Sequence, residues 1–192
     1  MSVAALAVAA ALLAVERASY AVIARVPGAF VRLCSRLAPS VRGGPVAVVG
    51  RLFCGFKGLQ VAVFGLWCWV HGGVAVPAEE PPLVLPLAVT LIAVGQFLVL
   101  ATFYRLGRIG VFFGDRFGYE LRRCREFPFS LLAHPQYVGT VLTIWGLFLA
   151  LRFPHDDWYA LPVIETLYYA AATRLESPGG PVQSSRKTMA PT

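Results

Sequence analysis

Long apolar runs with few charges are the feature that most constrains this chain. Residues 83–103 are the clearest example, because about 20 apolar residues are enough to cross the hydrocarbon core of a bilayer. The 192-residue sequence is 57% hydrophobic and 14% charged, whereas soluble domains are about 25% charged. This balance excludes an ordinary soluble globule and an intrinsically disordered chain. It predicts an all-α fold, a polytopic membrane helix bundle.

Four to five apolar helices are expected. The apolar segments are about 2–26, 52–70, 83–103, 137–151 and 158–173. The first contains Glu16 and Arg17, so it either lies in the interface or packs with these side chains inward. Lys57 lies in the second segment, where its long side chain is expected to snorkel toward water. One membrane domain, 1–176, is expected, followed by a disordered polar tail at 177–192.

The charges are distributed unevenly along the chain. The net charge of +7 comes largely from Arg residues in blocks at 27–51 and 104–136, whereas the loops 71–82 and 152–157 carry acidic residues. This pattern predicts that the basic side faces the cytosol and contacts anionic lipid head groups. No nucleic-acid-binding module is recognisable, so no nucleic-acid partner is expected. The dispersed Cys and His residues indicate neither a disulfide framework nor a metal site.

Three polar segments, called blocks here, have motif-like sequences that a simple connecting loop does not require. They are LGRIGVFFGDRFG at 106–118, EFPFSLLAHPQYVG at 126–139 and RLESP at 174–178. Because a hairpin at 152–157 returns the chain to the side from which it came, all three blocks are expected to meet at one membrane face. The sequence therefore predicts that the functional site of the protein lies at that face.

The two long blocks resemble motifs of the phospholipid methyltransferases, the small phosphatidylethanolamine N-methyltransferases. The similarity extends from about residue 16 to 178, and the L-G-x-x-G-x-F-x-G-D-x-F-G pattern at 106–118 is its most specific part. The segment His134-Pro135-Gln136-Tyr137 is also similar to the H-P-x-Y of the more distant isoprenylcysteine carboxyl methyltransferases.

The resemblance implies transfer of a methyl group from S-adenosylmethionine, without a metal, to the amine of phosphatidylethanolamine or of its mono- and dimethyl forms. Successive methylation of these lipids leads to phosphatidylcholine. The substrate is then a phospholipid in the bilayer, and the location is the endoplasmic reticulum membrane or a mitochondrial membrane. Two alternatives stay open: methylation of another amphiphile, such as an isoprenylcysteine carboxylate, and an inactive lipid-binding scaffold. The oligomeric state is not indicated.

The resemblance also assigns cofactor contacts. The family has a G-x-G in the third apolar segment and a Glu-Glu pair after the last one. Here these positions read Ala93-Val94-Gly95 and Glu176-Ser177, so each motif departs from the family pattern by one residue. The Ser in place of Glu removes a charge, and Glu176 retains one carboxylate.

Methyl transfer to an amine requires a positioned substrate, a proton acceptor and a site with little water. The candidate catalytic residues are Asp115, Glu176 and His134. The candidate substrate-binding residues are Arg108, Arg116 and Tyr137, which supply cations for a phosphate and an aromatic face for a methylated ammonium. Structural roles are the alternatives, with Asp115 capping a helix or pairing with Arg116, and Gly95 packing helices.

Overall fold

The computed structural model describes residues 2–38, 40–73, 82–121 and 124–176, and Ser177 and the predicted tail lie outside them. Within the described residues all regular structure is helical, which confirms the predicted fold class. The elements are α1 (Val3–Arg25), α2 (Pro27–Leu37), α3 (Gly44–Val70), α4 (Val84–Val111), the 3-10 helix η1 (Gly114–Phe117), α5 (Pro135–Arg152) and α6 (Ala160–Glu176).

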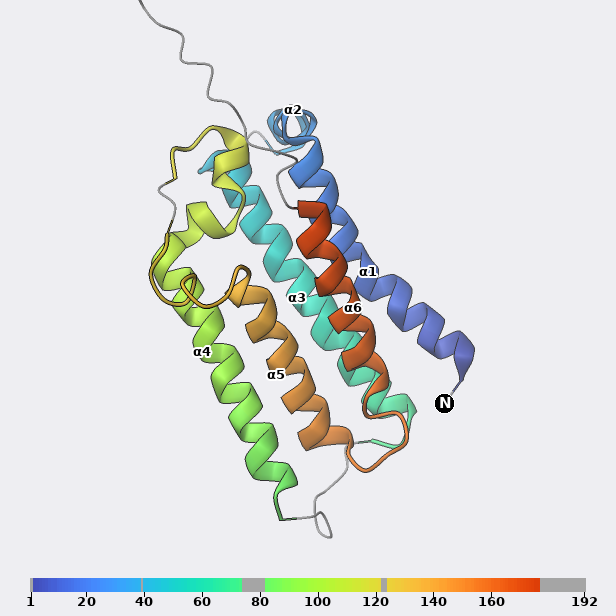
Figure 1. Ribbon diagram of the computed structural model, residues 1–192. Helices are drawn as coiled ribbons and strands as arrows, with labels where there is room; N and C mark the ends of the chain where they lie inside the picture. Colours follow the sequence, from blue (N-terminus) through green and yellow to red (C-terminus); the bar gives the residue numbers. More distant parts are fainter. Residues whose placement is uncertain (1, 39, 74–81, 122–123, 177–192) are drawn as a thin grey trace, which may run out of the picture.

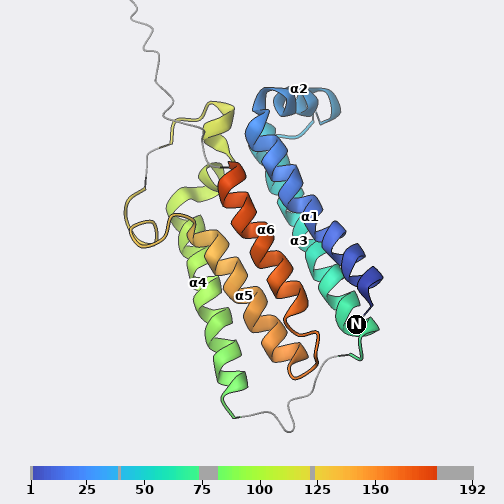
Figure 2. The same ribbon diagram turned by 45° about the vertical axis from the view of Figure 1, so that its right-hand side comes forward.

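Helices α1, α3, α4, α5 and α6 run side by side, and α2 lies across one end of the bundle (Figures 1 and 2). Among the described residues, three helices are long and apolar enough to cross a membrane: α1, α3 and Val84–Phe117, which includes α4. Helices α5 and α6 have 18 and 17 residues. The predicted membrane bundle is confirmed, but the predicted count of four to five spanning helices is not.

The helix boundaries follow from proline and glycine positions. Helix α1 ends at Arg25, one residue before the end of the predicted segment 2–26, because Pro27 starts the next helix. Helix α3 begins at Gly44 rather than near residue 52, so the exposed Arg51 belongs to the helix and not to the preceding loop. Helix α4 continues to Val111 through a kink at Gly107, whose φ of 62° is one that glycine adopts without strain.

Helix α2 is amphipathic and was expected only as a basic stretch. Its apolar face buries Cys34 and stacks Phe30 on Phe117 of η1 with 5.8 Å between ring centroids. The side chains of Arg32 and Arg36 are exposed. A short helix of this kind, lying across the end of a membrane bundle, is typical of the membrane interface (Figure 1).

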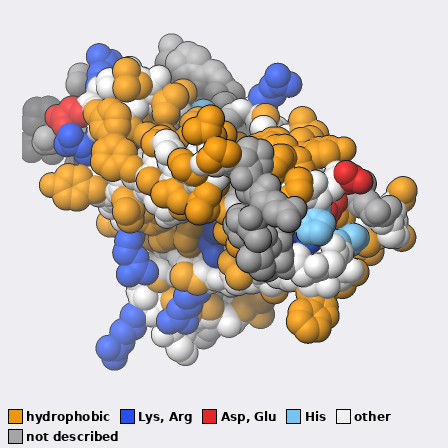
Figure 3. All heavy atoms as spheres, turned by 90° about the horizontal axis from the view of Figure 1, so that it is seen from below, with side chains coloured by type: hydrophobic (Ala, Val, Ile, Leu, Met, Phe, Trp, Pro, Cys, Tyr) orange, Lys and Arg blue, Asp and Glu red, His pale blue; other side chains and the backbone are white. Residues whose placement is uncertain are grey.

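The two ends of the bundle differ in composition. Helix α2, η1 and the last turn of α6 lie toward one end, called here the basic end (Figure 1). Parts of the blocks 106–118 and 174–178 are therefore at this end, whereas α5 begins further along the bundle. The N-terminus and the 152–159 turn lie at the other end, called here the hairpin end. Figure 3, which looks at the hairpin end, shows many hydrophobic side chains on the surface, and on its right-hand side His side chains lie close to acidic ones.

Helices α4 and α5 pack with their backbones almost in contact. A Cβ atom on Gly95 would lie 2.5 Å from the carbonyl oxygen of Gly139, and a Cβ atom on Gly146 would lie 2.7 Å from that of Ala88. Small residues at such positions let membrane helices approach closely, where van der Waals packing replaces the hydrophobic effect. We call Gly95, Gly139, Gly146 and Ala88 together the glycine seam.

A buried ion pair closes the hairpin end. Arg152 is 1% exposed and pairs with Asp157, and it also donates to the carbonyl oxygens of His71 and Gly73 at 2.9 and 2.5 Å. The indole of Trp67 donates to the second oxygen of Asp157 at 2.6 Å. Burial raises the pKa of Asp157, but the hydrogen bonds from Arg152 and Trp67 outweigh it and hold the pKa below its ordinary value. This clamp joins the end of α3 to the turn between α5 and α6.

The glycine seam predicts that Gly139→Ala destabilises the bundle by about 1–3 kcal/mol, because the added methyl group has to push α4 and α5 apart. Thermal unfolding in detergent measures the loss. Gly58→Ala is the control, because a Cβ atom on Gly58 meets no atom within 4 Å. Equal midpoints for the two variants would contradict the close approach of these helices.

The clamp predicts that Asp157→Asn costs about 3–5 kcal/mol, because it leaves the buried Arg152 without its counter-charge. Since the pKa of Asp157 is lower in the folded protein, its contribution is complete above about pH 4 and disappears as the pH falls through the native pKa. Unfolding midpoints measured from pH 7 to pH 3 test both statements.

The exposed neighbour Asp156 provides the matched control. Asp156→Asn is expected to change stability by less than about 0.5 kcal/mol, as surface substitutions usually do. If Asp157→Asn and the parent protein lost stability equally between pH 7 and pH 3, the ion pair would not contribute as the geometry indicates.

Candidate active site

Helix α1 carries a pair of opposite charges into the bundle. Glu16 is 4% exposed and Arg17 is 9% exposed, and Arg17 Nη2 lies 2.6 Å from Glu16 Oε1. Ionised groups inside a membrane bundle are costly unless they are paired, and they usually serve function. Of the two placements expected for this pair, the structure shows the inward one.

Helix α3 adds a second cation to this pair. The ammonium of Lys57 lies 3.1 Å from Glu16 Oε1 and donates to Gln60 Oε1 at 2.9 Å. The prediction that Lys57 snorkels toward water is therefore wrong, because a carboxylate inside the bundle attracts the ammonium more strongly than the distant interface does.

Helix α6 completes the network with two residues that the sequence analysis did not select. Glu165, 1% exposed, accepts a hydrogen bond from Gln60 Nε2 at 2.6 Å. The hydroxyl of Tyr169 accepts from Arg17 at 2.9 Å and from Lys57 at 3.3 Å. Glu165 is the one charged residue in the apolar segment 158–173, and this was the signal that could have identified it. These contacts tie α1, α3 and α6 together around buried charge.

Three tyrosine rings surround the guanidinium of Arg17. Its Cζ atom lies 4.0 Å from the ring centroid of Tyr169, 5.5 Å from that of Tyr20 and 5.7 Å from that of Tyr137. The electron-rich ring faces stabilise a desolvated cation. The same surroundings suit a substrate ammonium or a sulfonium.

A cavity of about 70 Å³ lies beside these groups, and we call it the polar cavity. Its lining includes Glu16, Arg17, Tyr20, Val49, Phe53, Lys57, Val111, Phe112, Phe113, Gln136, Tyr137, Thr140 and Tyr169. The block 106–118 supplies Phe112 and Phe113, and the block 126–139 supplies Gln136 and Tyr137. The two motifs therefore meet at the charged network.

A second, more open cavity of about 400 Å³ lies between the start of α5 and the end of α6. Its lining includes Leu132, Ala133, His134, Tyr137, Val138, Val141, Leu142, Thr166, Tyr169, Ala170 and Thr173. We call it the α5–α6 groove. Tyr137 and Tyr169 line both this groove and the polar cavity, and their rings meet edge to face at 5.3 Å. The tyrosine pair thus forms a border that the two cavities share.

The predicted substrate and catalytic residues lie in two places. His134 and Tyr137 line the α5–α6 groove, with their rings stacked at 5.6 Å. Asp115 is exposed at the basic end and lies 3.7 Å from Arg116, which is the pairing that the structural alternative gave for it. The side chain of Arg108 is also exposed. Neither Asp115 nor Arg108 lines the polar cavity or the α5–α6 groove.

The predicted cofactor-binding residues also lie in different parts of the bundle. Ala93 and Val94 are exposed on α4, and Gly95 belongs to the glycine seam. Glu176 is the last residue of α6, and Ser177 lies outside the described residues. Their contacts with a cofactor stay a prediction. Among the residues that the structure describes, no three His, Cys, Asp or Glu side chains are placed to hold a metal ion.

A bundle with three membrane-length helices, a buried cluster of charges and a cavity at that cluster defines a membrane protein with an internal polar site. A family model described as phospholipid methyltransferase matches residues 83–179, half of the chain. The chain therefore belongs to the phospholipid methyltransferase family, as its motifs predicted.

Similar proteins carry related names. The chain is 35% identical over 98 residues to the phosphatidyl-N-methylethanolamine N-methyltransferase of Schizosaccharomyces pombe, covering 50% of this chain and 49% of that protein. It is 31% identical over 115 residues to the phosphatidylethanolamine N-methyltransferase of Homo sapiens, covering 58% and 57% respectively. The chain spans about half the length of the curated relatives it matches. No solved structure matches it significantly.

The buried network predicts that Glu16→Gln destabilises the protein by about 3–5 kcal/mol, because Arg17 and Lys57 then lose their shared counter-charge. Glu126→Gln is the control, since the Glu126 side chain is 71% exposed in its pair with Arg105. That change is expected to cost at most about 1 kcal/mol. Equal losses of unfolding free energy in detergent would contradict the importance of the buried pair.

Proposed function

We propose that this chain is an S-adenosylmethionine-dependent N-methyltransferase of phosphatidylethanolamine or of its mono- and dimethyl forms. The observation that carries the proposal is the meeting of both motif blocks at the charged network, through Phe112 and Phe113 on one side and Gln136 and Tyr137 on the other. Membership of the family and the names of the relatives support the same reaction. The resemblance supports the endoplasmic reticulum membrane as its location.

The polar cavity is the proposed site for the polar part of the lipid. Arg17 and Lys57 line it together with Glu16, while Glu165, the second carboxylate of the network, is not among its lining residues. The buried Nε of Arg17 has no hydrogen-bond partner among the described residues, and we propose that it donates to an anionic oxygen of the head group. A guanidinium beside an ammonium suits a phosphate, and the neighbouring tyrosine rings suit a methylated amine.

The α5–α6 groove is the proposed site for S-adenosylmethionine, which supplies an electrophilic methyl group on a sulfonium. Its volume of about 400 Å³ lies within the range of small-molecule sites. The faces of Tyr137 and Tyr169 suit the sulfonium charge. Glu176 follows Thr173, a lining residue of the groove, by three residues on α6, which brings the predicted carboxylate to this end of the groove.

The residues of the chain then have distinct proposed roles. The amine nitrogen forms a bond to the methyl carbon while the carbon–sulfur bond breaks, and the amine has to give up a proton. His134, beside Tyr137 in the groove, is the proposed acceptor, because a neutral imidazole has a ring nitrogen that can accept a proton. Glu16 instead serves as the counter-charge that holds Arg17 and Lys57 in place. Asp115 and Glu176 remain the other candidate acceptors.

Expression in cells that cannot methylate phosphatidylethanolamine tests the proposal. Lipid extracts from cells labelled with a methyl-labelled precursor are expected to contain mono-, di- or trimethylated phosphatidylethanolamine, and their ratio reports which step is catalysed. An abundant, membrane-inserted protein that yields no methylated phospholipid would contradict the proposed function.

Within that assay, Tyr169→Phe is expected to lower the rate by about tenfold or more, because Arg17 loses a charge-assisted hydrogen bond beside the site. Tyr168→Phe is the matched control. The Tyr168 hydroxyl donates to the carbonyl oxygen of Ala10 at 3.0 Å, and Tyr168 lines neither cavity. Equal rates for the two variants would remove Tyr169 from the site.

A further inference from the structure

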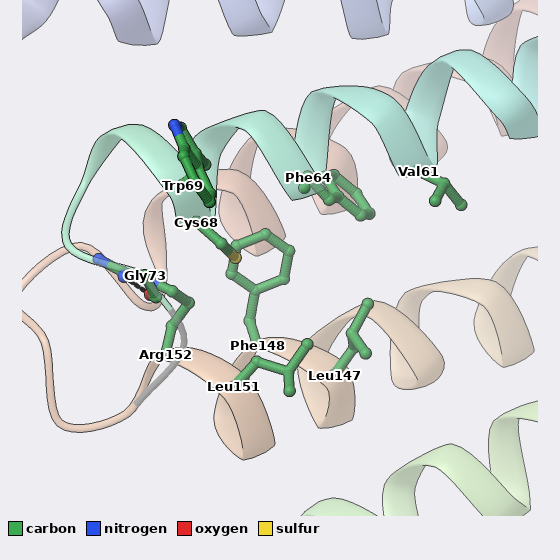
Figure 4. A pocket seen from close by; sticks show the side chains of 10 residues that line it. Val61, Phe64, Cys68, Trp69, Gly73, Leu147, Phe148, Leu151 and Arg152 are labelled. Atoms are coloured by element: carbon green, nitrogen blue, oxygen red, sulfur yellow. Dashed lines mark hydrogen bonds between the residues drawn. The ribbon is translucent and has the colours of Figure 1, made fainter. Parts of the chain in front are cut away.

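A third cavity, apolar and larger than the other two, opens between the second halves of α3 and α5. Its volume is about 540 Å³, and we call it the α3–α5 groove. Its lining includes Val61, Phe64, Gly65, Cys68, Trp69, Gly73, Leu147, Phe148, Leu151 and Arg152. Figure 4 shows Phe64 and Phe148 reaching toward each other from the two helices, and their rings meet edge to face at 5.0 Å.

The groove opens toward the lipid phase. It lies along α3, one of the helices with the length and composition to cross a membrane. Val61 and Trp69 line it and are 69% and 82% exposed, so its mouth is on the side of the bundle. An apolar hollow at this depth is filled by hydrocarbon rather than by water.

Along α3 and α5, the lining residues of the groove follow those of the polar cavity. On α3, Lys57 lines the polar cavity, and Val61 and Gly65 follow at steps of four residues in the groove. On α5, Thr140 lines the polar cavity, and Leu147 and Leu151 follow on the same helix face. A molecule with its polar part at Arg17 and Lys57 therefore has an apolar path leading from it.

The length of that path suits an acyl chain. The helical rise from Lys57 to Cys68 is about 17 Å, close to half of the roughly 30 Å hydrocarbon core of a bilayer. At the far end, Arg152 donates to the carbonyl oxygen of Gly73 (Figure 4) and also pairs with Asp157. A buried polar clamp is a poor neighbour for further methylene groups.

We propose that the α3–α5 groove binds one acyl chain of the phospholipid substrate and limits the length of that chain. The proposal rests on the proposed function, since it takes the head group of the same lipid to lie in the polar cavity. In this proposal the clamp at Arg152 has a second role, because it marks the end of the groove and thereby limits the length of the bound chain.

Gly65 permits a clean test. A Cβ atom on Gly65 meets no atom within 4 Å, so Gly65→Leu adds its side chain to the open groove without a clash in the bundle. Gly55→Leu is the matched control, because Gly55 is on the same helix, has equally open surroundings and does not line the groove. Both changes replace a helix glycine by the same good helix former.

The first measurement is photocrosslinking of the full chain in vesicles that contain phosphatidylethanolamine with a diazirine near the end of one acyl chain. Labelled peptides are expected from 61–73 and 147–152, and Gly65→Leu is expected to reduce that labelling about tenfold while Gly55→Leu does not, as one displaced contact does in a hydrophobic pocket. Equal labelling of the groove by a phosphatidylglycerol probe, or labelling unchanged in Gly65→Leu, would overturn the proposal by indicating bulk lipid.

The second measurement is the ratio of methylation rates for long-chain and short-chain phosphatidylethanolamine. Gly65→Leu is expected to shift the preference toward short chains by about tenfold relative to Gly55→Leu. An unchanged ratio would overturn the length limit. Because crosslinking needs no turnover, groove labelling in a protein without methyltransferase activity would contradict the proposed function while supporting the acyl-chain site.

Discussion

The shared ion cluster of Glu16, Arg17 and Lys57 is the interaction on which the arrangement of the bundle depends. Each of these charges would cost several kcal/mol if it were buried alone. Helices α1, α3 and α6 therefore have to bring polar partners to them. The hydroxyl of Tyr169 and the amide of Gln60 satisfy further donors and acceptors of the cluster. The positions of α1, α3 and α6 along the bundle axis are thereby fixed, and the cavity lies where their polar groups meet.

The cavities follow from two different kinds of helix contact. Along the glycine seam, backbone meets backbone, so α4 and α5 leave little space between them. Between α3 and α5 the contact is made by large rings such as Phe64 and Phe148, which hold the helices apart and leave a groove beside them. The same bundle thus combines a closely packed pair of helices with a path for lipid.

The sequence predicted the fold well, because the thickness of a bilayer sets the length of an apolar run. It placed the start of α3 eight residues late, since Arg51 was taken as part of a loop, although an Arg near a helix end can reach water from within the helix. It selected Tyr137 through its motif but missed Glu165 and the inward turn of Lys57. Those side chains find partners 105 and 41 residues away, and such pairing depends on three-dimensional register that local patterns do not contain.

The separation of these partners along the chain has a consequence for biosynthesis. Tyr169 follows Arg17 by 152 residues, which is roughly 8–30 s of translation at ordinary elongation rates. Lys57, 41 residues after Glu16, emerges much sooner. The first helix is therefore synthesised with a charge pair whose further partners come from α3 and, last, from α6. Closing the bundle is a late event, and the polar cavity exists only once translation has passed α6.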